Sequence, residues 1–222
     1  MKVTLENWSP DPEKMVAKST AHCRLSDTTS DTKNKNRVRA VIRAGHMSAL
    51  GQASATISVT GISRACSHQL VRHVFIRYQQ QSQRSIQAAP VFIIPPLPYI
   101  EDVYKRCRLI RMIEEDCIKA YERYSLYLTC GMRKEDARYI LPAASETGMW
   151  MHSTLQGWWD LLYGSRSYVA KEDTKLYRKG DVVMLGASRL DKHAQWEIQS
   201  VAVEIEKLLK DIAPNIFRRN FS

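Results

Sequence analysis

The residues best suited to bind a ligand or take part in a reaction lie in the stretch 61–85, which reads GISRACSHQLVRHVFIRYQQQSQRS. This stretch is rich in arginine, histidine and glutamine and contains no lysine. Arg64, His68 and Arg72 recur every four residues, with His73 next to Arg72, so that a helix would carry them on one side. Guanidinium, imidazole and amide groups gathered in this way predict a pocket for an anion and a planar, hydrogen-bonding ring.

The same stretch contains a candidate clamp for a phosphate or a cofactor. Arg72-His73 ends the predicted helix, and Ser82-Gln83-Arg84 begins nine residues after His73. The alternative is a solvated basic helix end that binds nothing specific. Local spacing does not separate these two interpretations.

The other candidate residues are weaker in isolation. His46 and His193 are lone histidines, which are more often structural than functional. No two histidines stand at metal-ligand spacing beside an acid, so a metal site is not expected. Cys66 is either a nucleophile or a small buried residue that packs the basic helix, and the second interpretation is favoured. The residues alone therefore predict an anion-binding enzyme whose reaction stays open.

The composition indicates which classes of binding partner to expect. The chain has 222 residues and a formal net charge of +10, which indicates anionic partners. Because the basic residues are scattered, nucleotides and phosphorylated cofactors fit as well as nucleic acid does. The five cysteines form no CxxC pair, so reduced thiols and a cytoplasmic location are expected. No apolar run has the length of a membrane span and no signal-peptide pattern is present, so no membrane partner is expected.

The hydrophobic pattern predicts the elements that must position these residues. The segment 88–99 carries four prolines and is not expected to be regular. The polar stretch 164–186 is expected to be an inserted excursion, either a loop or a hairpin. The elements together indicate one helix-rich α+β domain that covers residues 1–222. The pattern predicts helices at 13–23, 36–44, 62–73, 101–130, 134–139, 155–163 and 191–212, strands at 53–59 and 147–153, a loop at 26–35 and a turn at Gly61.

Together these segments resemble the flavin-dependent thymidylate synthases. That family is marked by Arg-His-Arg, seven residues, and then Ser. Here the corresponding residues are Arg72-His73-Val74 and, after seven residues, Ser82-Gln83-Arg84. The resemblance extends in the family's order to the segments 45–73, 136–142 (DARYILP) and 189–199 (RLDKHAQWEIQ).

The resemblance implies a fold and a reaction. The implied fold is a central antiparallel sheet with flanking helices, assembled as a homotetramer with shared active sites. The implied reaction is reductive methylation of the uracil ring of dUMP at carbon 5, giving dTMP. Methylenetetrahydrofolate would supply the carbon, FAD the hydride, and NADPH the electrons that regenerate the flavin. In this family no enzyme cysteine attacks the ring, and a nucleic-acid partner is not expected.

The resemblance also implies roles for individual residues, carried over by position. Arg189 would lie over the pyrimidine carbonyls and stabilise the negative charge that develops there, and it is expected to be catalytic together with Ser82. The remaining residues would bind the two ligands. The nucleotide would contact Gln69, Gln80, Ser82, Arg84, Arg138 and Arg189, and FAD would contact His46, Ser48, Arg72, His73 and His193.

The chain departs from the family pattern at several positions. Val74 replaces the second arginine of the signature, and Gly51 stands where a glutamate is usual. These changes keep two alternatives open: methylation or hydroxymethylation of another uridylate such as UMP, and a non-catalytic nucleotide- or nucleic-acid-binding relative. The other departures are Gln52 for a histidine, Arg77 for a small residue, Ser85 for a tyrosine, and Thr154 and Gln156 for an asparagine and an arginine beside the flavin.

Overall fold

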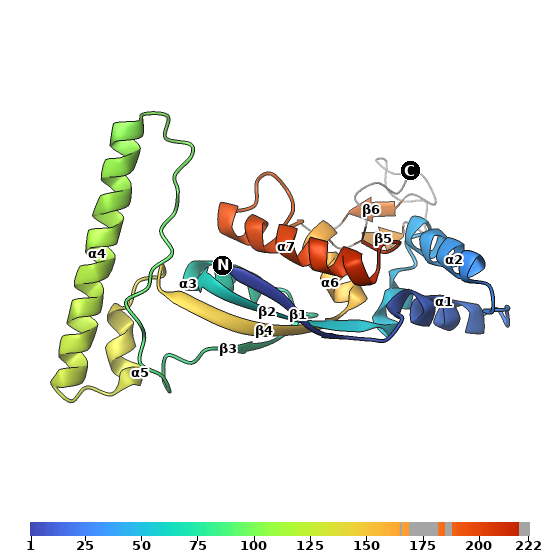
Figure 1. Ribbon diagram of the computed structural model, residues 1–222, viewed down its shortest axis with the longest axis horizontal. Helices are drawn as coiled ribbons and strands as arrows, with labels where there is room; N and C mark the ends of the chain where they lie inside the picture. The colour runs from blue at the N-terminus through green and yellow to red at the C-terminus, as the bar shows by residue number, and fades with distance from the viewer. Residues whose placement is uncertain (165, 169–181, 185–187, 218–222) are drawn as a thin grey trace. The chain divides into compact units, whose positions relative to one another are not determined.

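The protein is an α+β structure in which helices flank one main sheet (Figure 1). The computed structural model describes residues 1–164, 166–168, 182–184 and 188–217. Its elements, in chain order, are β1 (Lys2–Trp8), α1 (Pro12–His22), α2 (Asp31–Arg43), η1 (Met47–Gln52), β2 (Ser54–Ser63), α3 (Arg64–Leu70), β3 (Arg77–Gln80), α4 (Val103–Thr129), α5 (Lys134–Ala137), η2 (Arg138–Ile140), β4 (Glu146–Thr154), α6 (Leu155–Tyr163), β5 (Arg166–Tyr168), β6 (Val182–Met184) and α7 (Trp196–Ile212).

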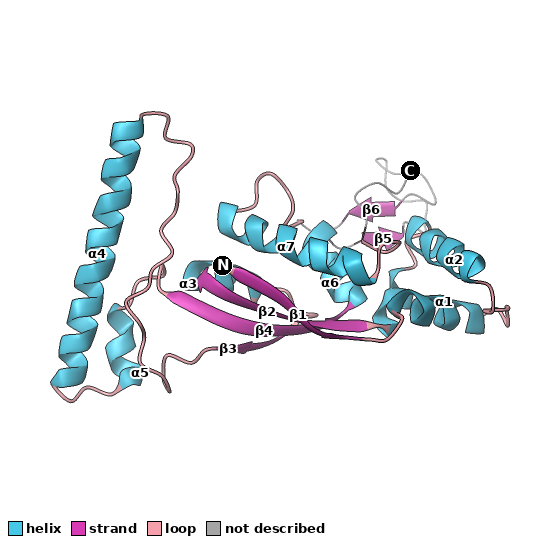
Figure 2. Ribbon diagram, in the orientation of Figure 1, coloured by secondary structure: helices cyan, strands magenta, loops and turns pink. Residues whose placement is uncertain are grey.

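The main sheet has four antiparallel strands in the order β1-β2-β4-β3 (Figure 2). This confirms the predicted fold class. The two central strands, β2 and β4, are the two strands that the sequence predicted. The two edge strands, β1 and β3, were not predicted, because edge strands are short or largely exposed and carry little apolar alternation.

The described residues cluster into two compact units, and the long strands β2 and β4 each contribute residues to both. Unit 1 comprises residues 1–2, 59–70 and 79–149, and unit 2 comprises residues 3–58, 71–78 and 150–222. The prediction that the chain is a single domain stays a prediction.

Unit 1 contains the long helix α4, which confirms the helix predicted at 101–130. The Asp102 side chain caps its N-terminus by accepting a hydrogen bond from Lys105 N at 3.0 Å. The proline-bearing segment before it has no regular structure, as predicted, and runs alongside the helix (Figure 1). Ala88 N in that segment donates to the Tyr124 hydroxyl at 3.2 Å. Cys117 and Tyr124 are the two residues of α4 that are buried.

Unit 2 holds the main apolar core. Trp158 and Trp159 of α6 are fully buried, and Trp158 Nε1 donates to Ala55 O of β2 at 3.0 Å. The bounds of α6 are those predicted for the tryptophan-rich helix. Helices α1, α2 and η1 pack on one another, and α6 contacts both η1 and α7. None of the helices in the described part of the chain is long and apolar enough to cross a membrane.

The structure corrects two helix boundaries. Helix α2 begins at Asp31, within the segment predicted as a loop, because the Ser30 side chain caps it by accepting from Lys33 N at 3.4 Å. Helix α7 begins at Trp196 rather than at residue 191, because Asp191 forms a turn in which its Oδ1 accepts from His193 N at 2.8 Å.

A third correction concerns the stretch 61–85. Gly61 is not a turn but lies within β2, which continues to Ser63. Its φ is +70°, and a Cβ at this position would lie 2.9 Å from Met1 N, so the strand bend requires glycine. Helix α3 therefore covers only Arg64–Leu70 instead of 62–73, and Arg72 and His73 lie beyond its end.

The excursion at 164–186 is described only at its two ends. Strand β5 pairs with β6 in antiparallel fashion, with Arg166 opposite Met184. This pairing fits the hairpin alternative. The rest of the predicted excursion, residues 165, 169–181 and 185–186, lies outside the described residues.

Candidate active site

A cavity of about 410 Å³ in unit 1 gathers polar groups from three segments, and two of these segments contribute basic residues. Arg64 and His68 come from α3, Gln83 from the segment after β3, and Arg138 from η2. Helix α3 is fixed there because Arg64 N donates to Ser145 O at 3.0 Å. The remaining wall is apolar and consists of Ala65, Leu141, Pro142 and Ala143.

The two arginines of this cavity have few acceptors. Burial lowers the pKa of Arg64, and the nearby Arg138 guanidinium lowers it further. Arg64 Nη2 donates to Gln81 O at 2.9 Å, but its buried Nε has no hydrogen-bond partner among the described residues. Arg138 Nε donates to Glu135 O at 3.1 Å. Such a pair costs free energy in the empty protein, and a bound oxyanion would offset that cost.

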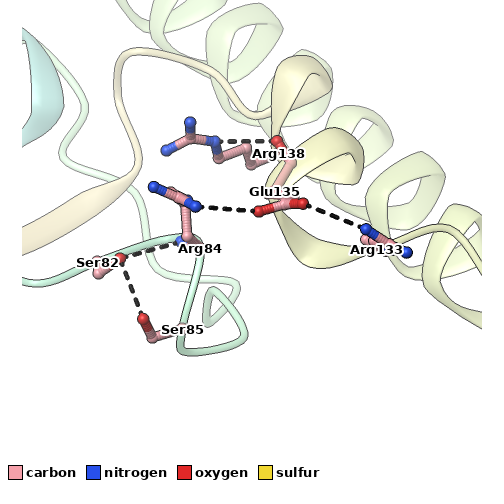
Figure 3. Close-up of polar contacts among 6 residues, drawn as sticks. All are labelled: Ser82, Arg84, Ser85, Arg133, Glu135 and Arg138. Atoms are coloured by element: carbon pink, nitrogen blue, oxygen red, sulfur yellow. Dashed lines mark hydrogen bonds and ion pairs between the residues drawn. The ribbon is translucent and has the colours of Figure 1, made fainter.

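Ser82 and Arg84 flank Gln83 on a tight turn beside these groups (Figure 3). Ser82 Oγ accepts from Arg84 N at 3.3 Å. Arg84 Nη2 lies 3.4 Å from Glu135 Oε2, and its side chain is 65% exposed. Figure 3 shows the Arg84 and Arg138 guanidinium groups next to each other. An exposed ion pair of this kind is weak, so Arg84 can exchange Glu135 for a phosphate at little cost.

Gln80 and Gln69 lie in the same unit. Gln80 Nε2 donates to Ser67 Oγ at 2.8 Å and to Thr147 Oγ1 at 3.3 Å, which links β3 to α3 and β4. Ser67 and Thr147 are buried, so Gln80 is held in one orientation. Gln69 is half-buried in the last turn of α3. The predicted nucleotide contacts of both glutamines stay predictions.

A larger cavity, of about 640 Å³, lies in unit 2 between α1, α2 and η1. His46 and Ser48, two of the predicted flavin ligands, both line it and are exposed. Arg24 and Arg37 add two guanidinium groups that sequence reasoning missed, since neither belongs to a recognisable motif. The other lining residues offer hydroxyls, a thiol, an amide and small apolar side chains: Ser19, Thr20, Cys23, Ala40, Val41, Ala44, Ala49 and Gln52.

His73 and Arg189 meet in unit 2. Arg189 Nε donates to His73 Nε2 at 2.9 Å, although 116 residues separate them in the sequence. Burial, and then the Arg189 charge, lower the pKa of His73 to about 4. The Tyr78 hydroxyl donates to His73 O at 3.2 Å, and burial raises the pKa of Tyr78. Sequence reasoning assigned Tyr78 no role.

Two predicted flavin ligands, Arg72 and His193, are exposed. Val74, one of the positions that depart from the family pattern, is 80% exposed. A Cβ added at Gly51 would lie 3.6 Å from Gln156 Oε1, so two of the departing positions are neighbours.

The competing candidates have structural roles. Cys66 is fully buried in α3, as favoured from the sequence, and all five cysteines are free thiols. Within the described residues, no group of three or more His, Cys, Asp or Glu side chains is placed to hold a metal ion.

Curated relatives match nearly the whole chain. The sequence model of the family described as "Thymidylate synthase complementing protein" matches residues 4–215. The flavin-dependent thymidylate synthase of Geobacter sulfurreducens is 31% identical over 226 residues, which cover 98% of this chain and 86% of that protein. The enzyme of the same name from Clostridium tetani is 29% identical, with the same coverage of both chains.

A solved structure shares the fold. It is a UMP/dUMP methylase from Streptomyces cacaoi bound with 5-Br dUMP, which is 18% identical, and the match has a TM-score of 0.74 and covers 97% of this chain and 92% of that one. With a family match over residues 4–215 and 31% identity across 98% of its length to a curated member, this chain belongs to the flavin-dependent thymidylate synthase family of nucleotide methyltransferases.

Proposed function

We propose that this enzyme catalyses the flavin- and folate-dependent reductive methylation of dUMP at carbon 5, which gives dTMP. The observation that carries the proposal is the cavity of unit 1, where Arg64 and Arg138 lie close together and the buried Arg64 Nε has no hydrogen-bond partner among the described residues. A nucleoside monophosphate brings a dianionic group that fits this need. The names of the curated relatives support the choice of reaction.

The nucleotide is held by polar groups of unit 1. Arg84 and Arg138 bind the phosphate as forks, and Ser82 donates its hydroxyl. Arg64 and His68 extend this set, because both line the same cavity as Arg138. Gln69 and Gln80 complete the set by contacting the nucleotide as amides.

Arg189 is the catalytic cation in this proposal, and Ser82 is the second catalytic residue. A guanidinium next to the pyrimidine carbonyls stabilises the negative charge that accumulates when carbon 5 becomes nucleophilic. Its fixed charge suits this role, since arginine stays protonated even when partly buried.

The residues around the larger cavity fit FAD. The walls combine apolar groups, which suit a ring, with the Arg24 and Arg37 guanidiniums and the Ser48 hydroxyl, which suit phosphate oxygens. FAD, when bound, supplies the hydride of the reductive step. His46 and Ser48 would orient it from η1, and Arg72, His73 and His193 are the other proposed ligands. Methylenetetrahydrofolate as carbon donor and NADPH as reductant are the proposed co-substrates.

UMP is the second candidate substrate. The solved structure with the same fold is a UMP/dUMP methylase, and the exposed Val74 changes the flavin signature of this chain. The deciding experiment incubates the protein with FAD, NADPH, methylenetetrahydrofolate and either dUMP or UMP, and identifies each product by mass. A mass gain of one methyl group on dUMP alone supports dUMP as the substrate. The same gain on UMP alone would make UMP the substrate instead. No flavin binding and no product would refute both.

We further propose a cytoplasmic homotetramer with shared active sites. Helix α4 exposes many large apolar side chains in the single chain, including Tyr104 at 90%, Val103 at 55% and Ile118 at 51%. Burial of such a surface against another copy favours assembly. Free thiols at all five cysteines agree with a reducing compartment.

A further inference from the structure

The contact between Arg189 and His73 joins two residues that the family resemblance assigns to different ligands. Arg189 Nε carries a hydrogen at all times, so it is the donor of the 2.9 Å bond, and His73 Nε2 is the acceptor. An accepting Nε2 requires a neutral imidazole with its hydrogen on Nδ1. The contact therefore fixes both the charge and the tautomer of His73.

Both residues lie on backbone that is anchored to the same part of unit 2. The Tyr78 hydroxyl holds His73 O at 3.2 Å. Two residues further on, Phe75 O accepts from Ser153 Oγ at 2.8 Å, immediately before α6. On the other side, Arg189 N donates to Leu161 O of α6 at 3.1 Å. Strand β4 holds the backbone near the imidazole, and helix α6, which directly follows β4, holds the backbone of the guanidinium residue.

The surroundings keep His73 neutral over the working pH range. Among the described residues, the charged group beside the imidazole is Arg189, and the Tyr78 hydroxyl contacts the His73 carbonyl. Burial and the Arg189 charge hold the pKa of His73 at about 4, and a Tyr78 phenol stays uncharged because its pKa is raised. His73 can therefore accept from Arg189 at any pH at which the protein is expected to work.

We propose that His73 is a positioning residue that sets the rotation of the Arg189 guanidinium, and with it the direction of its Nη edge. The inference rests on the proposed function, in which Arg189 acts on the pyrimidine. It replaces the role of flavin ligand that the family resemblance gives to His73, because an imidazole whose Nε2 is committed to Arg189 contributes to turnover through that arginine. A fixed guanidinium plane avoids reorganisation when charge develops on the ring.

The kinetic test uses the FAD-loaded enzyme and three substitutions. His73→Leu removes the acceptor at similar volume, His73→Gln keeps an acceptor oxygen, and Arg189→Ala removes the donor. We expect His73→Leu to lower kcat about 10- to 100-fold with nearly unchanged KM for the nucleotide and unchanged FAD affinity. His73→Gln should recover part of kcat. In the Arg189→Ala background His73→Leu should cost nothing more, whereas a full additional loss would overturn the proposal.

A second measurement needs no turnover. The pKa of His73, followed by NMR titration, should rise above about 4 when Arg189 is replaced by Gln, but it should stay below 6.5 because burial, the larger cause of the lowered pKa, persists. An unchanged pKa would show that the two side chains do not meet in solution and would overturn the inference, even if the enzyme is active. A raised pKa in a protein that makes no product would leave the contact standing and refute the proposed reaction instead. Loss of FAD affinity in both His73 variants would mark His73 as a flavin ligand and also overturn the positioning role.

Discussion

Replacing Arg64 by methionine should weaken nucleotide binding while leaving the empty protein as stable as before, or more so. Methionine has a similar length and no charge. The substitution removes a buried Nε that has no hydrogen-bond partner among the described residues, and whose desolvation costs about 1–3 kcal/mol. It also removes the bond to Gln81 O, worth about 1 kcal/mol. The expected change in the free energy of unfolding is therefore between zero and about +2 kcal/mol.

The effect on binding should have the opposite sign. One charge-assisted hydrogen bond to a phosphate contributes about 1.5–3 kcal/mol, so Arg64→Met should raise the Kd for dUMP or UMP about 10- to 150-fold. Binding of the nucleoside, which lacks the phosphate, should not change. The Kd of Arg64→Lys for the nucleotide should lie between the values for the unchanged protein and Arg64→Met, because lysine keeps the charge but loses the two-pronged guanidinium geometry.

The assay combines isothermal titration with nucleotide and nucleoside and chemical denaturation of the empty protein. Arg133→Met is the matched control, because Arg133 is 82% exposed, pairs loosely with Glu135 at 3.9 Å and does not line the cavity. The control should change neither quantity. Unchanged nucleotide affinity together with a free energy of unfolding lowered by more than about 1 kcal/mol would identify Arg64 as a purely structural residue and refute the reasoning.

Three further predictions test other parts of the molecule. Val74→Arg should tighten FAD binding, measured by fluorescence quenching, because it adds a cation where the family signature has one; weaker binding would mean that the pocket has reorganised. Acidification from pH 6.5 to 4 should lower the free energy of unfolding through His73, whose pKa is lowered in the folded protein. It should raise the free energy of unfolding through Asp160, whose pKa burial raises to about 6. Denaturation at several pH values should therefore show a steeper acid loss in Asp160→Asn and a shallower one in His73→Gln; parallel profiles would contradict the pKa shifts. Met112→Glu with Ile118→Glu, which charges the exposed face of α4, should lower the mass measured by light scattering, and an unchanged assembly would exclude this face as the contact.

Sequence reasoning predicted best the elements whose burial pattern is local. Helix α6 carries apolar residues on nearly all sides, so its bounds at Leu155–Tyr163 could be read directly. Prediction from the sequence failed where a contact with a residue distant in the sequence determines the backbone conformation. The bend at Gly61 exists because the chain start passes within reach of it, and no local pattern reports that neighbour. The strand continues to Ser63 and α3 ends at Leu70, so Arg72 and His73 do not share a helix face with Arg64 and His68.

The same limit applies to the candidate site. Spacing indicated that Arg64 and His68 belong together, and both do line one cavity. It could not indicate that His73 pairs with Arg189, because hydrogen bonds between segments 116 residues apart leave no periodic signal. The family resemblance found both residues, but assigned each to a ligand rather than to the other.

Two of the departures from the family pattern lie next to each other and remove opposite charges. Gly51 stands where a glutamate is usual and Gln156 where an arginine is common, and the two positions are neighbours in unit 2. Loss of one member of such a pair would leave an uncompensated charge at a partly enclosed position, which costs several kcal/mol. Loss of both leaves a neutral amide beside a glycine and no orphaned charge. The two substitutions together therefore alter the polarity at η1 and α6 while leaving the net charge of these two positions unchanged.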